Sequence, residues 1–332
     1  MLSYFIRRLI YMVILLTIVS VAAFVIIELP PGDYVTSYIL SLEAQGAAPS
    51  AELAAALRKQ YGLDLPLHLR YFKWGWKMLH GDFGLSFQYN EPVSELIAER
   101  LSLTIIISLF AFAFTYLLAI AIGIYSATHQ YSVGDYTFTV IGFTGLAIPN
   151  FLFALILMFF FYKYFDLSIG GLFSSQYMEA AWSMAKFTDM LKHLPIPIIV
   201  IGTASTAGLI RVMRSCLLDE LKKQYVITAR AKGVSERTLL FKYPVRVAIN
   251  PIISTIGWIL PAIISGETIT AIVLDLPTVG PLLYSALLNQ DMFLAGSTIM
   301  FLSFLTIIGT LMSDILLVWV DPRIRYEKRG ES

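Results

Sequence analysis

Six charge-free apolar runs dominate the hydrophobic pattern of this 332-residue chain. They cover residues 9–27, 101–134, 136–162, 193–210, 247–266 and 292–313. Each is near or above the roughly 18–20 apolar residues that a helix needs to cross a bilayer. One such run is compatible with a buried core helix, but six are not. The pattern therefore predicts an all-α integral membrane protein with six transmembrane helices, at about 9–29, 101–127, 138–162, 194–215, 247–274 and 293–320.

Basic residues set the expected orientation. Lys and Arg collect at the N-terminus, at the C-terminus and in segment 211–246, which holds nine of them, whereas loop 275–292 holds none. Loop 163–193 carries three lysines against three acids and gives a weak opposite signal. Because Lys and Arg of short loops stay on the cytoplasmic side, six crossings place both termini and segment 211–246 in the cytoplasm.

Segment 30–100 is then a large external loop between the first two transmembrane helices. It is rich in aromatic residues and carries turn residues at Gly62, Pro66, Gly81 and Gly84, which predicts a cap of short helices. Ala51–Tyr61 is predicted as one such helix, with Ser50 or Pro49 at its start. A solvated loop is the alternative.

Composition and charge exclude several classes of protein. Only 14% of the residues are charged, against about 25% in a soluble domain. A net charge of +1 gives no signal for nucleic acid. The single cysteine, Cys216, excludes an internal disulfide framework, and the sequence has no HExxH, GxSxG or phosphate-loop motif. The first apolar run is longer than a signal-peptide core, and "ELPPGD" follows it instead of a small-residue cleavage site.

One basic segment, "YVITARAKGVSERTLLFKYPVR", stands between two apolar runs. Asp219–Lys232 is predicted as a helix, followed by a left-handed turn at Gly233. Ser235 is then expected to cap a second helix over 236–243, which Pro244 ends. From the residues alone, a basic helix that rests on anionic lipid is an equally good interpretation.

The stretch "TARAKGVSERTLLFKYPVRVAINP" resembles the EAA loop of ABC importer permeases. Ala229 and Gly233 match that loop, and Pro251 stands eighteen residues after Gly233, where the family pattern has a proline. Other motifs are similar to the dipeptide and oligopeptide branch, in order from near residue 1 to 326. They are LPPGD, YGLDLPLHLRYFKW, GDFGLSF, IPNF, LDLPTVGPLL and DPRIRY.

The resemblance implies a type I ABC importer permease with four kinds of partner. These are a second homologous permease subunit, two ATP-binding subunits, an external solute-binding protein and the lipid bilayer. ATP and Mg²⁺ belong to the ATPase subunits, so this chain is expected to hold no cofactor, no metal and no catalytic residue. It divides into the first transmembrane helix (1–29), the external cap loop (30–100), the permease core (101–326), the cytoplasmic coupling segment (216–246) and the cytoplasmic tail (327–332).

The resemblance also implies that the coupling segment seats in a cleft of an ATPase subunit. The residues expected to form this contact are Thr228, Ala229, Arg230, Ala231, Lys232, Gly233, Val234, Ser235, Arg237, Arg246 and Pro251. Four further residues are candidates for the translocation path: Glu267, Asp314, Pro149 and Phe151. A carboxylate in lipid is unfavourable by about 2.5–3.5 kcal/mol, so the two acids face either a polar path or another helix. Packing against lipid is the alternative for Phe151.

Other polar and aromatic residues have interfacial interpretations. Glu28 is expected near water at the outer end of the first helix. Arg211 and Arg214 are expected to anchor the fourth helix at the cytoplasmic interface. The tryptophans of the outer segments, Trp74, Trp76 and Trp182, are expected near the outer interface.

The substrate stays open between a peptide and an oligosaccharide. The chain departs from the family pattern at Tyr34, which replaces a proline, at Thr278, which replaces a glycine, and at Ala271, which replaces a glutamate. A secondary transporter or channel is a rival class, although the sequence has no clear internal repeat. A membrane-embedded enzyme is another, although the four histidines all lie outside the predicted spans.

Overall fold

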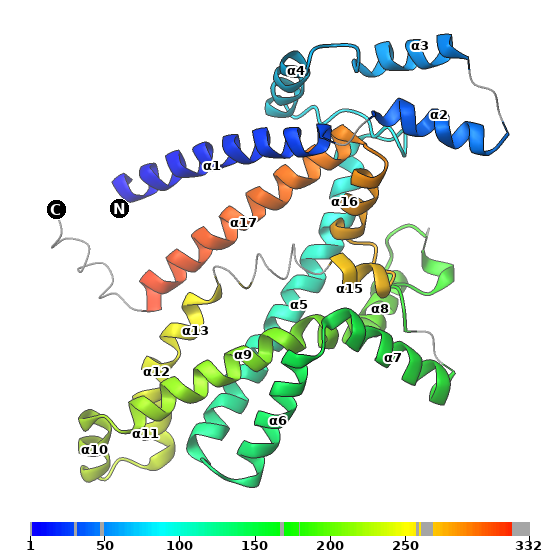
Figure 1. Ribbon diagram of the computed structural model, residues 1–332. Helices are drawn as coiled ribbons and strands as arrows, with labels where there is room; N and C mark the ends of the chain where they lie inside the picture. Colours follow the sequence, from blue (N-terminus) through cyan, green and yellow to red (C-terminus); the bar gives the residue numbers. More distant parts are fainter. Residues whose placement is uncertain are drawn as a thin grey trace. The chain divides into compact units, whose positions relative to one another are not determined.

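The computed structural model describes residues 2–29, 32–46, 50–166, 169–178, 180–256, 259 and 268–320. Within these ranges the chain is helical, and its extended pairing is limited to one isolated bridge between Leu85 and Pro92 (Figure 1). The helices of the N-terminal half are α1 (Leu2–Glu28), α2 (Tyr34–Ala44), α3 (Ala51–Tyr61), α4 (Leu67–Leu79), α5 (Val93–Thr128), α6 (Val133–Ala147) and α7 (Asn150–Phe165). Those that follow are η1 (Ser175–Tyr177), α8 (Met184–His193), α9 (Pro195–Leu221), α10 (Gln224–Ala231), α11 (Glu236–Lys242), α12 (Pro244–Ala248), α13 (Asn250–Ser254), α15 (Thr268–Val273), α16 (Val279–Leu288) and α17 (Met292–Val320).

The chain forms two units, which we describe separately. The first unit comprises Met1–Leu103 with Thr278–Ile307. Its core gathers side chains that are far apart in the sequence, including Phe24 of α1, Trp74 of α4 and Leu294 of α17. The helix predicted over Ala51–Tyr61 is confirmed, because the Ser50 hydroxyl accepts the Leu53 N–H and Gly62 ends the helix with a φ of 69°. Trp74, expected at an interface, is instead buried in this core.

The second unit comprises Thr104–Pro277 with Ile308–Ser332 and is built around α9. This helix packs against α6, α7, α8, α12 and α13. Glycine residues on α5 and α6 let these helices approach α9 closely. A Cβ added at Gly123 of α5 would lie 2.5 Å from the Met213 Cβ, and one at Gly145 of α6 would lie 2.8 Å from the Thr203 Cγ2. Glycines of this kind let membrane helices approach closely and gain van der Waals contact.

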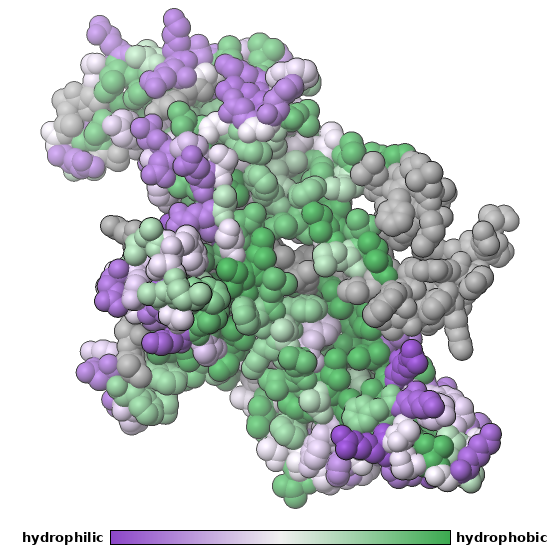
Figure 2. Space-filling model, turned by 180° about the vertical axis from the view of Figure 1, so that it is seen from behind, coloured by the Kyte–Doolittle hydropathy of each residue, from purple (hydrophilic) through white to green (hydrophobic). Residues whose placement is uncertain are grey.

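Four described helices are long and apolar enough to cross a membrane: Ile10–Glu28, Val93–Thr128, Pro195–Leu221 and Met292–Met312. They correspond to the predicted first, second, fourth and sixth spans. The second begins eight residues earlier than predicted, because Val93, Leu96 and Ile97 pack into the core of the first unit. On the face shown in Figure 2, hydrophobic residues cover much of the surface, whereas hydrophilic residues gather over α2–α4 and over α10–α11.

The predicted third span, 138–162, is wrong as a single helix. α6 and α7 are separate helices that meet at an angle of 105°. The break falls at Ile148, whose backbone is extended, and at Pro149, the N-cap residue of α7. A residue before proline avoids the helical region, and proline has no N–H for the helical ladder. The pair counts as a fifth span only if both helices cross together.

The predicted fifth span, 247–274, is partly described. Residues 257–258 and 260–267 lie outside the described ranges. The described part consists of the short helices α12, α13 and α15 rather than one continuous helix. Proline residues begin α12 and α13, since Pro244 and Pro251 each stand in a first helical turn. The count of six spans therefore stays a prediction.

Replacing Gly123 with valine should destabilise the second unit. Its side chain would overlap Met213 and approach the Ile210 carbonyl oxygen, which would lie 3.3 Å from an added β-carbon. Overpacking of this kind costs about 1–3 kcal/mol, so the full-length Gly123→Val chain should unfold at a lower temperature in detergent. Gly208→Ala on α9 is the matched control, because a Cβ there meets nothing within 4 Å. Equal midpoints for the two variants would contradict the close packing of α5 on α9.

Candidate functional site

α10 and α11 form a helical hairpin, residues 224–242, whose turn is set by Gly233. The Gly233 N–H donates to the Arg230 carbonyl oxygen at 3.0 Å, and the Val234 N–H donates to the Ala229 carbonyl oxygen at 3.3 Å. With Gly233 at a φ of 79°, these bonds form the Schellman motif, in which a left-handed residue closes the end of a helix. The left-handed turn predicted at Gly233 is confirmed.

The hairpin has a small hydrophobic core of its own. Val226 and Ala229 of α10 and Leu239 of α11 are buried together, and Val234 packs against them. A hydrophobic contact between the residue after the turn and the last turn of the helix typically accompanies a Schellman motif. These contacts fix the angle between the two short helices, neither of which is long enough to be stable alone.

One local prediction for this hairpin is wrong, and a second is confirmed only in part. Asp219–Lys232 is not one helix, because α9 ends at Leu221 and Lys223 is extended with a ψ of 147°. The change of direction turns Val226 toward Leu239, a tertiary contact that the sequence does not reveal. Ser235 does occupy the N-cap position of α11, but its hydroxyl donates to the Thr238 hydroxyl rather than accepting a backbone N–H.

The hairpin presents an exposed surface that is both apolar and basic. Ile227 and Phe241 are 47% and 54% exposed, and Lys232 and Arg237 are also exposed. Arg230 is held differently, because its Nε and Nη2 donate to the two carboxylate oxygens of Glu236 at 2.6 and 3.0 Å. This hydrogen bonding lowers the pKa of Glu236 and raises the pKa of Arg230. The ion pair joins α10 to α11 across the turn.

The remaining predicted contact residues fall into two places. Thr228 and Ala231 are exposed on α10, and the Thr228 hydroxyl donates to the Gln224 carbonyl oxygen. Arg246 of α12 and Pro251 of α13 are exposed outside the hairpin, on helices that pack against α9. The predicted contact residues between 228 and 237 therefore lie on the hairpin, whereas Arg246 lies on α12 and Pro251 on α13.

The translocation-path candidates do not form a described cluster. Pro149 stands at the break between α6 and α7, and Phe151 is 37% exposed in the first turn of α7. Glu267 and the side chain of Asp314 lie outside the described residues. All four therefore stay predictions.

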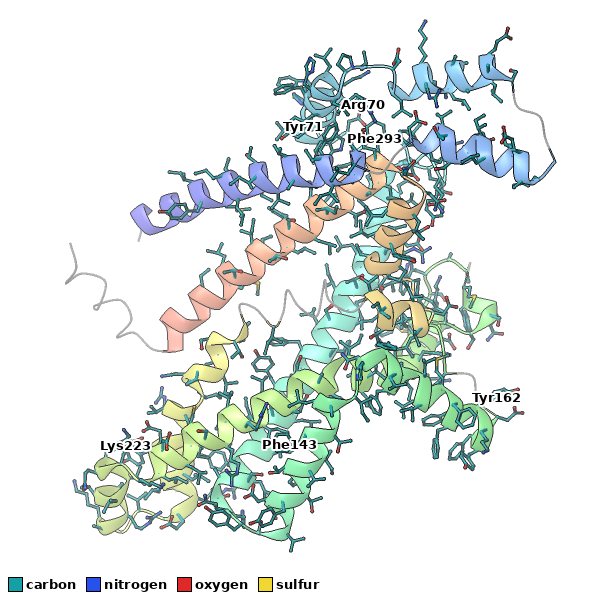
Figure 3. All side chains as sticks on the ribbon, in the orientation of Figure 1. Arg70, Tyr71, Phe143, Tyr162, Lys223 and Phe293 are labelled. Atoms are coloured by element: carbon teal, nitrogen blue, oxygen red, sulfur yellow. The ribbon has the colours of Figure 1, made fainter. Side chains whose placement is uncertain are left out.

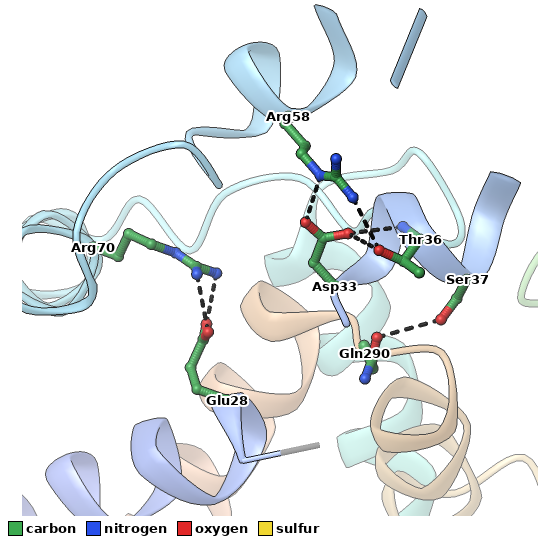
Figure 4. A network of polar contacts seen from close by, with 7 residues as sticks. All are labelled: Glu28, Asp33, Thr36, Ser37, Arg58, Arg70 and Gln290. Atoms are coloured by element: carbon green, nitrogen blue, oxygen red, sulfur yellow. Dashed lines mark hydrogen bonds and ion pairs between the residues drawn. The ribbon is translucent and has the colours of Figure 1, made fainter. Parts of the chain in front are cut away.

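A polar network in the first unit was not predicted from the sequence (Figure 4). Asp33 accepts the Thr36 N–H and hydroxyl, both at 2.7 Å, and the Arg58 Nε at 2.9 Å. It therefore caps α2 and ties it to α3. Burial raises the pKa of Asp33, but the hydrogen bonds from Arg58 and Thr36 outweigh burial and hold it below its ordinary value. Glu28, expected near water, forms an ion pair with Arg70 at 2.6 Å.

Asp291, just before α17, accepts hydrogen bonds from the segment of the same unit that contains the motif "GDFGLSF". Its carboxylate accepts the Ser86 hydroxyl at 2.6 Å, the Gln88 N–H at 3.1 Å and the Leu294 N–H at 3.1 Å. The side chain is fully buried, and burial raises the pKa of Asp291. An acid directly before a long apolar run was the signal available in the sequence, because such a residue favours the N-cap position.

Arg214 forms a bidentate pair with Asp135 in the second unit. Its Nε and Nη2 donate to Asp135 at 2.9 and 2.8 Å, and the Asp135 side chain is almost fully buried. Asp135 also accepts the Tyr131 N–H at 3.0 Å, while its own N–H donates to the Ser132 hydroxyl. Arg214 was expected to be an interfacial anchor, and its charge is instead used to join α9 to the start of α6.

Two family descriptions together match most of the chain. Residues 1–109 match the N-terminal membrane component of binding-protein-dependent transport systems. Residues 119–326 match the description "Binding-protein-dependent transport system inner membrane component". With the apolar helices above, these matches establish the class: the chain belongs to this family and is a multi-pass inner-membrane permease subunit of an ABC importer.

Named relatives are similar to the chain over its whole length. The oligopeptide transport system permease protein AppB of Bacillus subtilis is 35% identical over 328 residues, which cover 98% of this chain and 100% of AppB. The inner membrane ABC transporter permease protein YejB of Escherichia coli O157:H7 is 31% identical, with coverage of 98% and 100%. A peptidoglycan transport system permease protein of Agrobacterium fabrum, also named YejB, is 29% identical, with coverage of 98% and 99%.

Asp33→Asn should loosen α2 and α3 more at neutral pH than in acid. A folded-state pKa below the unfolded value of about 4 means that the stabilisation is present above that pH and is lost as pH falls through the folded pKa. Hydrogen exchange of residues 34–61 at pH 7 should accelerate by roughly twofold to fivefold. At pH 3 the difference between the variant and the parent should be smaller, because Asp33 of the parent is then partly protonated. Asp64→Asn, at an exposed acid of the same unit, should change neither rate, and an equal effect at both pH values would exclude the charge of Asp33 as the cause.

Proposed function

We propose that this chain is one of two permease subunits of an ATP-driven importer, and that it passes a peptide from an external binding protein into the cytoplasm. The second subunit is a homologous permease, and two ATPase subunits hydrolyse ATP. Support comes from membership of the binding-protein-dependent family, whose systems need an external binding protein and an energy source. In this assembly the present chain forms part of the path for the solute and connects that path to an ATPase subunit.

The hairpin 224–242 carries the proposal, as the contact with one ATPase subunit. It is a rigid element with its own core, yet Ile227 and Phe241 remain exposed beside Lys232 and Arg237. Exposed apolar side chains with a basic rim are typical of a protein interface rather than of a solvated turn. A cleft of an ATPase subunit with apolar walls and acidic edges would complement this surface.

The flanking helices provide a route for motion from the hairpin into the membrane. α10 follows α9 after two residues, and α12, which packs against α9, follows α11 after one residue. Met213 and Leu217 of α9 are fully buried in this unit, and Val245 and Ala248 of α12 are buried as well. A displacement of the hairpin would therefore carry α9 and α12 together, because well-packed interfaces move as rigid bodies.

The proposed substrate is a peptide, by similarity to AppB, which is named for oligopeptide transport. The Agrobacterium relative is named for peptidoglycan transport, so an oligosaccharide or a mixed glycopeptide is the alternative within the same class. Uptake of a labelled oligopeptide by the reconstituted complex with its binding protein distinguishes these substrates. Exclusive uptake of an oligosaccharide would keep the permease role and replace the peptide.

The proposed topology has six spans with both termini in the cytoplasm. Five of these are α1, α5, the α6–α7 pair, α9 and α17, and the other is residues 247–274. The support is the set of apolar helices and the concentration of basic residues at the termini and in 211–246. This topology makes residues 30–100 external and the hairpin cytoplasmic.

Gly233→Val should weaken the hold on the ATPase subunits while leaving the chain in the membrane. A Cβ at Gly233 meets nothing within 4 Å, so the change acts through the left-handed backbone, where a β-branched residue is disfavoured by at least about 1 kcal/mol. The Schellman bonds and the angle between α10 and α11 should then be lost. We expect less ATPase protein to co-purify, and ATP hydrolysis should lose its response to the loaded binding protein.

Gly233→Asn is the matched control, because asparagine tolerates the left-handed region better than other non-glycine residues. It should retain most of the coupling. If the valine variant co-purifies normally and responds normally, the hairpin is a lipid-surface element and the ATPase contact lies elsewhere.

The topology predicts opposite accessibility of two exposed positions. In a Cys216→Ser chain, Ala44→Cys should react with an impermeant thiol reagent added to intact cells. Lys242→Cys should react only after the cells are opened. Reversal of either result would contradict the proposed orientation without affecting the family assignment.

A further inference from the structure

A groove of about 460 Å³ runs between α6 and α9 in the second unit. Tyr136 and Phe143 line it from α6, Arg211 and Ser215 line it from α9, and Lys222 lines it directly after the end of α9. Figure 3 shows Phe143 where α6 lies beside α9. Residues 211, 215 and 222 recur at helical spacing on one face of α9, so the groove follows the helix for about 16 Å at 1.5 Å per residue.

Arg211 is an exposed cation within a candidate membrane span. It lies ten residues before the end of α9, and its guanidinium stands 5.3 Å from the centre of the Phe143 ring. In the described part of the chain it makes no ion pair, whereas Arg214, one turn further along, is fully engaged by Asp135. An arginine at the edge of a membrane span favours an anionic partner, because lipid does not solvate a bare charge.

The rest of the groove is amphipathic. Lys222 is exposed near the end of α9 and has no ion pair among the described residues, and Ser215 and Thr139 add hydroxyl groups. Of the two acids in the lining, Asp135 pairs with Arg214, which leaves Asp219. Arg211 and Lys222 therefore outnumber the remaining acid by one. On the α6 side, Tyr136, Val140 and Phe143 share one helical face and are 58%, 64% and 51% exposed.

We propose that this groove binds an anionic phospholipid. Arg211 holds the phosphate diester of the headgroup, Lys222 adds positive charge about 16 Å further along the groove, and an acyl chain lies against the exposed apolar side chains of α6. Charge complementarity favours this occupant over an apolar face of another permease subunit, which would leave Arg211 unpaired. The position of Arg211 also matches, because a basic side chain that begins in the apolar zone reaches outward to the headgroup level.

A bound lipid would tie α6 to α9 beside the helix that leads into the hairpin. The Asp135–Arg214 pair already joins these helices from within the second unit, and the phosphate would add a second connection on the outer surface of the same two helices. The proposal depends on the membrane location of the chain and not on the identity of the transported solute.

Native mass spectrometry of the purified transporter complex tests the site with three probes. These are phosphatidylglycerol, a diacylglycerol with the same acyl chains, and inorganic phosphate. Phosphatidylglycerol should be retained and should raise the unfolding temperature, whereas the other two should do neither. In Arg211→Gln/Lys222→Gln the affinity for phosphatidylglycerol should fall about tenfold, as expected for the loss of charge-assisted hydrogen bonds.

Two matched variants separate a lipid site from general damage. Arg211→Lys keeps the charge and should retain the lipid, and Lys192→Gln removes an exposed charge of α8, outside the groove, and should change nothing. Equal effects of diacylglycerol or inorganic phosphate, or normal lipid retention by the double glutamine variant, would overturn the proposal. So would a disulfide cross-link from Ser215→Cys, in a Cys216→Ser chain, to a cysteine introduced in the second permease subunit, because it would show that protein covers the groove.

Discussion

Close packing around α9 is the constraint on which the second unit depends. Membrane helices gain little from hydrophobic association, because lipid is as apolar as their side chains, so van der Waals contact has to hold them together. Gly123 and Gly145 provide that contact by removing side chains at the crossing points. Gly202 of α9 does the same toward α5, where an added Cβ would lie 2.6 Å from Phe114. A helix held this closely on several sides transmits displacement instead of absorbing it.

Charged residues complete this arrangement at the end of α9. Arg214 is neutralised by Asp135, which leaves Arg211 and Lys222 directed to the outer surface of the same helix. Beyond them the chain turns at Lys223 into a hairpin whose own core is only a few residues. The three features follow one another along the chain as packed helix, charged groove and compact hairpin, which is the order that the proposed connection to an ATPase subunit requires.

Carboxylates that accept several hydrogen bonds join separate segments of the first unit. Asp291 accepts hydrogen bonds from Ser86 and Gln88, more than two hundred positions away in the sequence, and also caps the start of α17. Asp33 joins α2 to α3 through Arg58. A carboxylate that accepts several N–H and O–H groups organises loops that have little hydrophobic core of their own. The motifs LPPGD and GDFGLSF therefore have structural roles in addition to marking the family.

The sequence by itself determined the class of the protein, the position of its longest helices and the turn at Gly233. These depend on local properties, namely runs of apolar residues and the unique backbone freedom of glycine. Only the tertiary structure decided that 138–162 bends at Pro149, that α9 ends before α10, and that Arg214 pairs with Asp135. Each of these depends on a partner far along the chain or on which of several prolines breaks a helix. The sequence pattern specifies neither the distant partner nor the proline that breaks a helix, because the free energy that selects among the possible contacts arises only when the helices pack.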